Sequence, residues 1–160
     1  SPICPKTRFC LRMRKTMRFL TTSALAALLG LGLAPLAAAQ AGPGAAAYRE
    51  GVSLERGRQF PQAIEKYRAA IAAEGNNARY HYSLGSALYK SRQYAQAAAS
   101  FRQAATLKPH VSNYHARQAQ AHAKANQPAE AIAAYNIAYA TEKTNLARKT
   151  TFKVNAIRLM

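Results

Sequence analysis

From residue 44 onward, apolar side chains recur every three or four residues, which is the spacing of one face of an α-helix. Leu84 and Leu88 show this spacing, and so do Ala97, Phe101 and Ala104. Alanine-rich stretches between them favour helix as well. The pattern is helical rather than strand-like, and it predicts an all-α fold.

The pattern also repeats along the chain, with a constant period of about 34 residues that is typical of helix-turn-helix repeats. Gly51, Gly85 and Ala119 are evenly spaced at this period, and other small and aromatic residues keep the same phase. In such repeats each hairpin completes the apolar core of its neighbour. We therefore predict three stacked hairpins, at 44–77, 78–111 and 112–145. The residues in phase are Ala63, Ala97 and Ala131, Ala70, Ala104 and Ala138, Tyr67, Phe101 and Tyr135, and Phe60 with Tyr94.

Small residues and turn-forming residues indicate where the hairpins cross and end. We expect Gly85 and Ala97 to let the two helices of the second hairpin approach closely. Pro61 and Pro128 are expected to open second helices, because the first turn tolerates a missing N–H, and Glu130 suits a first turn. Side chains expected around the second crossing are Leu84, Leu88, Tyr94, Phe101 and Leu107, and the expected breaks between hairpins are Gly75-Asn76-Asn77 and Lys108-Pro109.

These positions resemble the tetratricopeptide repeat family, and the second copy agrees with the family pattern best. The first copy departs from it at Glu50 and Gly75, and the third at Gln118, Pro128 and Lys143. Departures in the end copies are expected, since terminal repeats face solvent on one side. The resemblance implies a right-handed solenoid of three helix-turn-helix hairpins that binds proteins or peptides.

Residues 146–160 are predicted to form a C-terminal capping helix. Phe152, Ala156 and Leu159 share one stripe, which would cover the third hairpin. Thr144 is the expected N-cap. The basic residues fall mostly outside this stripe.

The first part of the chain has the three-part layout of a secretory signal peptide, predicted at 13–41. A basic patch that includes Arg14 precedes an apolar run at 19–36, and small residues follow. Translation is expected to start at Met13 or Met17, with 1–12 as upstream sequence, and cleavage is expected after Ala39 or Ala41. An uncleaved membrane anchor is the alternative. Export would place the protein in the periplasm of a Gram-negative bacterium or outside the cell.

Composition argues against catalysis. The chain has no Asp, and its cysteines, Cys4 and Cys10, precede the signal, so the mature chain would lack a thiol nucleophile and Cys ligands for zinc. His115 and His122 would share a helix face, but His81 and His115 occupy a repeat position that packing side chains normally fill. We expect no enzyme activity, no metal and no cofactor.

Charge and the family resemblance together suggest a partner. The net charge of +17 would fall to +11 after cleavage, because Lys6, Arg8, Arg12, Arg14, Lys15 and Arg18 would be removed. In the resembled family, the first helices line a concave groove, and the matching positions here are basic and aromatic, which suits an acidic peptide or protein. The alternative is that these side chains only solvate the helices. The groove positions are Tyr48, Arg49, Glu55, Arg56, Arg79, Tyr82, Tyr89, Lys90, Asn113, Arg117, Gln120 and Lys124.

One specific version of this groove is not matched. The family's carboxylate clamp for chaperone tails would require Lys, Asn or Arg at five positions, of which only Arg117 fits; the others are Tyr48, Val52, Ser83 and Asn113. The partner class therefore stays general, and so does the oligomeric state.

Two other binding functions remain open from the charge alone, namely nucleic acid and anionic envelope surfaces. Export makes nucleic acid unexpected. Membrane contact is expected only through an uncleaved signal.

Overall fold

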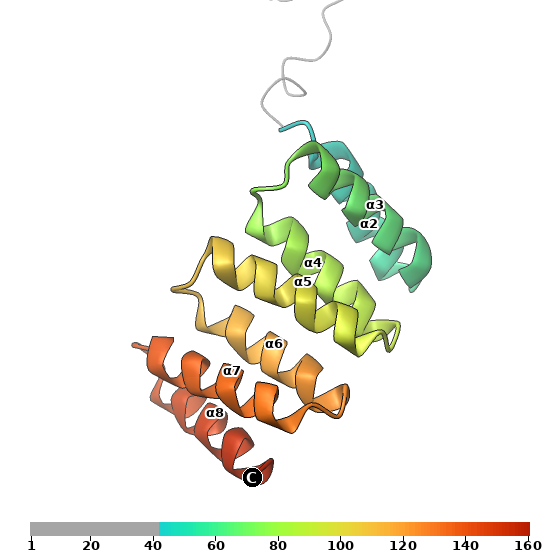
Figure 1. Ribbon diagram of the computed structural model, residues 1–160. Coiled ribbons are helices and arrows are strands. Elements are labelled where there is room, and N and C mark those ends of the chain that lie inside the picture. The colour runs from blue at the N-terminus through green and yellow to red at the C-terminus, as the bar shows by residue number, and fades with distance from the viewer. Residues whose placement is uncertain (1–41) are drawn as a thin grey trace, which may run out of the picture. The chain divides into compact units, whose positions relative to one another are not determined.

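The computed structural model describes residues 42–160, so the predicted upstream residues at 1–12 and the predicted signal at 13–41 lie outside the described residues. Within 42–160 the chain forms helices and no strands (Figure 1). The helices are α2 (Ala45–Arg56), α3 (Phe60–Ala73), α4 (Ala78–Lys90), α5 (Tyr94–Leu107), α6 (Ser112–Lys124), α7 (Pro128–Thr141) and α8 (Leu146–Arg158).

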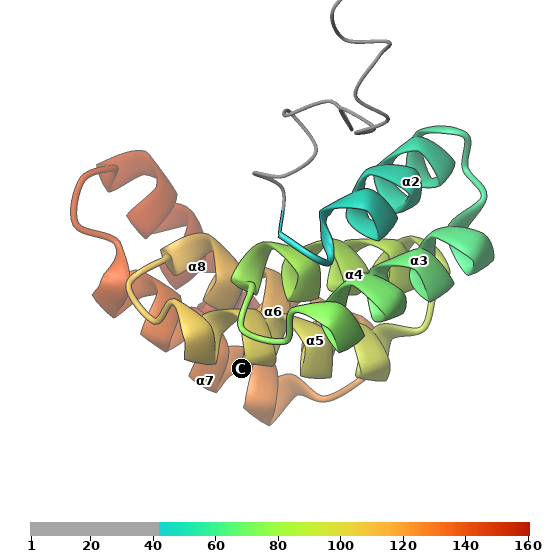
Figure 2. The ribbon, with the colours of Figure 1, turned by 90° about the horizontal axis from the view of Figure 1, so that it is seen from above.

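The helices pack in chain order as antiparallel hairpins. Helices α2 and α3, α4 and α5, and α6 and α7 form the three hairpins, and α8 packs against α7 (Figure 1). In Figure 2 the first helices α2 and α4 lie on one side of the stack, and the second helices α3 and α5 lie on the other. The predicted all-α solenoid of three hairpins with a capping helix is confirmed.

In each of the first two hairpins, the two helices cross where a glycine of the first helix contacts an aromatic ring of the second. A Cβ on Gly51 would lie 2.7 Å from Tyr67 Cε1, and a Cβ on Gly85 would lie 2.8 Å from Phe101 Cδ1. Ala97 is fully buried beside this contact. The predicted close approach at Gly85 and Ala97 is confirmed.

The turn inside each hairpin is built in the same way. Arg58, Arg92 and Asn126 are separated by one repeat period each, and they adopt left-handed backbone conformations with φ of 59°, 63° and 61°. The next residue then donates its N–H to a carbonyl in the last turn of the first helix, as Gln93 does to Leu88 at 2.9 Å. The second helices follow, with Pro128 as the first residue of α7 and Pro61 as the second residue of α3.

The core consists of two clusters of buried side chains. The first joins α2 to α6 around Tyr67, Leu88 and Phe101, and the second joins α6 to α8 around Tyr135 and Phe152. Leu107 was expected to fill the second hairpin, but its side chain is 37% exposed. That expectation was wrong because Leu107 is the last residue of α5, where the helix leaves the packed layer.

The capping helix packs as predicted, since Phe152 and Ala156 are buried against α7 and Leu159 is partly buried. Its N-cap is Asn145 rather than Thr144, because the Asn145 side chain accepts a hydrogen bond from Arg148 N at 2.9 Å. The Thr144 hydroxyl instead donates to Glu142 Oε1 at 3.2 Å. None of the helices in 42–160 has the length and apolar character needed to cross a membrane.

Candidate functional site

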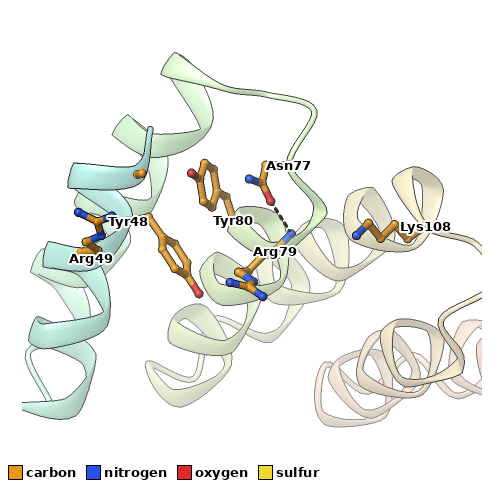
Figure 3. A pocket seen from close by; sticks show the side chains of 7 residues that line it. Tyr48, Arg49, Asn77, Arg79, Tyr80 and Lys108 are labelled. Carbon is orange, nitrogen blue, oxygen red and sulfur yellow. Dashed lines mark hydrogen bonds between the residues drawn. The ribbon is translucent and has the colours of Figure 1, made fainter. Parts of the chain in front are cut away.

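A pocket of about 390 Å³ lies between α2 and α4, and Lys108 reaches it from the end of α5 (Figure 3). Its side chains come from three segments that are far apart in sequence. We call it the basic pocket. It is lined by Ala45, Tyr48, Arg49, Asn77, Arg79, Tyr80 and Lys108.

Stacked tyrosines form the inner wall of the basic pocket. The ring centroids of Tyr48 and Tyr80 are 4.9 Å apart, and the two rings stack with an interplanar angle of 27°. The Tyr48 ring also packs against the Tyr67 ring, with 5.7 Å between their centroids. Tyr80 is almost completely buried, and its hydroxyl donates to Glu74 Oε2 at 3.2 Å. Burial raises the pKa of Tyr80, so its phenol stays neutral. The inner wall therefore consists of packed aromatic rings, with Tyr80 neutral.

Three cationic side chains line the pocket together with this wall. Arg49, Arg79 and Lys108 are exposed, and within residues 42–160 none of them has a carboxylate oxygen within 4.0 Å. Arg79 stands in the first turn of α4, where the Asn77 side chain accepts a hydrogen bond from its backbone N–H at 3.2 Å. The positive end of the α4 dipole adds to the potential of these side chains. The basic pocket is suited to an anionic group.

A second hollow, of about 370 Å³, continues from the basic pocket along α2. It shares Tyr48 and Arg49 with the basic pocket and extends to Val52, Ser53 and Arg56. An extended peptide could therefore contact both places at once.

Glu55 lies on α2 as well, but its carboxylate serves the scaffold. It accepts hydrogen bonds from the Tyr67 hydroxyl at 2.7 Å and the Ser86 hydroxyl at 3.2 Å, and it pairs with Lys90 at 2.7 Å. The Lys90 ammonium also lies 5.9 Å from the Phe60 ring centroid. Glu55 and Lys90 thus join the first two hairpins.

Other predicted groove residues lie between α4 and α6. The Tyr82 and Tyr114 rings pack in a tilted arrangement with 5.2 Å between their centroids, and Asn113 Nδ2 donates to the Tyr82 hydroxyl at 3.4 Å. Arg117 and Gln120 share a hydrogen bond of 3.2 Å on α6. Lys124 is exposed in the last turn of α6, whereas Tyr89 packs edge-on against Tyr94 at 5.2 Å.

The structure thus brings together only some of the predicted set. Tyr48, Arg49 and Arg79 share the basic pocket, and Arg56 lies in the adjoining hollow. Sequence reasoning missed Asn77, Tyr80 and Lys108 as pocket residues. A signal for Lys108 existed: it follows Glu74 by one full repeat, and the repeat places successive inter-hairpin loops along one edge of the stack.

Three of the four histidines, His81, His115 and His122, contact backbone or amide oxygens. His81 Nε2 donates to the Gly75 carbonyl at 2.9 Å, His115 Nε2 to the Pro109 carbonyl at 3.1 Å, and His122 Nδ1 to Gln127 Oε1 at 2.9 Å. The first two contacts are repeats of one another and tie a first helix to the loop before it. Across 42–160, no three His or carboxylate side chains gather as a metal site would require.

Comparison with known proteins agrees with this architecture. The tetratricopeptide repeat model matches residues 48–112 and again 82–145. No curated protein matches the sequence.

Solved structures resemble the chain at low sequence identity, which shows the fold alone. The first TPR of Spaghetti (RPAP3), bound to HSP90 peptide SRMEEVD, has a TM-score of 0.63 and 16% identity over 72% of this chain and 89% of that chain. The Arabidopsis OM64 TPR domain has a TM-score of 0.62 and 24% identity, over 72% of this chain and 93% of that chain. The Yersinia enterocolitica type III secretion chaperone SycD, in complex with a peptide of the translocator YopD, has a TM-score of 0.64 and 16% identity, over 71% of this chain and 88% of that chain. With a family model that spans most of its helices, this chain belongs to the tetratricopeptide repeat family.

Proposed function

We propose that this protein is an exported interaction module that binds an acidic segment of a partner protein, with the acidic group in the basic pocket. One observation carries the proposal: Arg49, Arg79 and Lys108 line one pocket together with two stacked tyrosines, and within 42–160 none of the three has a carboxylate partner. Guanidinium groups bind carboxylates through paired hydrogen bonds, and rigid tyrosines offer contact area at low entropic cost.

Structures of the same fold support binding of a peptide. RPAP3 holds an HSP90 peptide, and that peptide, SRMEEVD, is acidic. SycD holds a peptide of a translocator. In this chain, however, the cations stand at Arg49, Arg79 and Lys108, so we infer a different register of contacts from that of the chaperone-tail clamp.

Export is the second part of the proposal, and it rests on the basic, apolar and small-residue order of 13–41. Intact-mass measurement of the native protein tests it. A mature chain that begins after Ala39 or Ala41 is expected. A mature chain that retains Leu25 to Leu36 would favour the membrane anchor instead.

Partner capture from an envelope extract, followed by affinity measurement, tests the binding site. We expect Arg49→Gln/Arg79→Gln to weaken the captured partner by about tenfold or more, because such residues act as anchors. The control Arg92→Gln/Arg102→Gln removes the same charge from exposed positions elsewhere and should change affinity less than about threefold. Equal losses in both variants would show that only net charge matters.

Salt titration separates this function from nucleic-acid binding. Nucleic-acid affinity falls steeply with salt because each neutralised phosphate releases counterions. A pocket with tyrosine contacts should lose affinity more gently, and a steep loss would favour nucleic acid.

A further inference from the structure

The outer face of α8 combines exposed apolar side chains with positive charge. Leu146 is 76% exposed, Val154 51% and Ile157 58%. At about 100° per residue these three fall on the side of the helix opposite buried Phe152. Met160, just after the helix, is 90% exposed. Most of the large exposed apolar side chains of 42–160 are therefore at this end of the stack.

The charge of α8 has one sign only. The helix contains Arg148, Lys149, Lys153 and Arg158 and no acidic residue. Arg148 is paired with Glu142 at 3.4 Å, and the Lys149 ammonium lies 4.6 Å from the Tyr139 ring centroid on α7. Lys153 and Arg158 are exposed, and their positions flank Val154 and Ile157.

We propose that the outer face of α8 binds an anionic lipid surface, with Val154 and Ile157 entering the headgroup region and Lys153 and Arg158 contacting lipid phosphates. Charge complementarity selects this occupant. A second copy would bring two faces of equal positive charge together, which opposes association. The outer side of a terminal helix is also a ridge, and a ridge suits a broad deformable surface better than it suits a peptide.

This inference differs from the expectation that membrane contact requires an uncleaved signal. It does not depend on the basic pocket, which is formed by α2, α4 and the end of α5. Peripheral attachment through α8 would leave that pocket available for a partner held near the membrane.

Vesicle flotation of the full protein tests the proposal. The protein should float with vesicles that contain phosphatidylglycerol and stay behind with vesicles of phosphatidylcholine alone. Lys153→Gln/Arg158→Gln should weaken binding by about tenfold or more, since each basic residue near an anionic surface contributes roughly fivefold. Val154→Ser/Ile157→Ser should weaken it by a similar factor, because two apolar side chains no longer enter the lipid.

Two controls keep the result interpretable. Arg92→Gln/Arg102→Gln removes the same charge outside α8 and should bind vesicles within about threefold of the parent. The thermal unfolding midpoint of each variant should match that of the parent, because all of the changed side chains are exposed.

Several results would overturn the proposal. The first is that the protein does not float with phosphatidylglycerol vesicles. The second is that Val154→Ser/Ile157→Ser binds these vesicles as well as the parent does. The third is that Arg92→Gln/Arg102→Gln loses as much vesicle binding as Lys153→Gln/Arg158→Gln. Light scattering that shows a dimer dissolved by Ile157→Ser would assign the face to a second copy and would also overturn it.

Discussion

At the scale of single residues, the first two hairpins depend on the absence of a side chain at one position of their first helix. Phe101 is 2% exposed and lies against the Cα of Gly85, as Tyr67 lies against Gly51. A ring held by both helices of a hairpin cannot turn aside to make room for a methyl group. This close approach fixes how the first two hairpins cross.

Gly85→Ala is therefore expected to destabilise the protein by about 1–3 kcal/mol through overpacking against Phe101. Urea unfolding measures the loss. Gly75→Ala, in the turn between α3 and α4, is the control for a glycine with room for a methyl group, since the nearest atom to its added Cβ is the Ile71 carbonyl oxygen at 3.6 Å. An equal loss in both variants would mean that the contact with the Phe101 ring is not what limits position 85.

A glycine in place of the left-handed residue of a hairpin turn is expected to stabilise the protein, in contrast to Gly85→Ala. Arg92 has φ of 63°, a conformation that costs a residue with a side chain about 1–2 kcal/mol relative to its preferred regions. Arg92→Gly should raise the free energy of unfolding by up to about 1 kcal/mol. Arg102→Gly, inside α5, should lower it by about 1 kcal/mol. A loss of stability in Arg92→Gly would contradict the account of the turn.

At the scale of elements, α8 is held to the third hairpin by a buried carboxylate as well as by Phe152. Glu142 accepts hydrogen bonds from the Ser112 hydroxyl at 2.7 Å and from the backbone N–H groups of Thr144 and Asn145 at 3.3 and 3.2 Å. The Ser112 bond, with these backbone bonds, lowers the pKa of Glu142 from 4.5 to about 2. The ionised form therefore stabilises the junction of α6, α7 and α8.

The sign of this shift predicts how stability depends on pH. Because the pKa of Glu142 is lower in the folded protein, its contribution is complete above pH 4.5 and is lost as the pH falls toward 2. Glu142→Gln should lower the unfolding midpoint at neutral pH and remove part of the midpoint's fall below pH 4.5. Thermal unfolding followed by circular dichroism over this range measures both effects.

Glu65→Gln is the matched control for Glu142→Gln. Glu65 is exposed, and among residues 42–160 its ion-pair partner is Arg68 on its own helix, at 2.9 Å, so its loss should change the midpoint little. If Glu142→Gln follows the same pH curve as the parent, the buried carboxylate is not what holds α8.

At the scale of the whole molecule, the repeat period was enough to predict the fold, because every hairpin reuses the same contacts between small and aromatic residues. The period could not predict contacts that depend on exact helix ends. Leu107 was missed because it is the last residue of α5, where the helix leaves the packed layer. Asn145 takes the place of Thr144 as the N-cap of α8, because a repeat period locates a helix end only to within one or two residues.

The candidate site was predictable only where it follows the first helices. Tyr48, Arg49 and Arg79 came from repeat positions on α2 and α4, whereas Lys108 comes from a loop and Tyr80 from the buried side of α4. Of the predicted groove residues, Glu55 and Lys90 are paired with each other. Such pairing depends on the distance between neighbouring helices, which the sequence pattern does not specify.

Site-specific photo-crosslinking of the captured partner tests the central claim most directly. The chain has no cysteine beyond Cys4 and Cys10, so with both changed to Ser a single new cysteine can carry the probe. Ser53→Cys places the probe in the hollow beside Arg49, and Gln96→Cys places it on an exposed position in the first turn of α5, at the opposite end of that helix from Lys108. We predict a crosslink to the partner from position 53 and none from position 96. A crosslink from position 96 alone would contradict a binding site in the basic pocket.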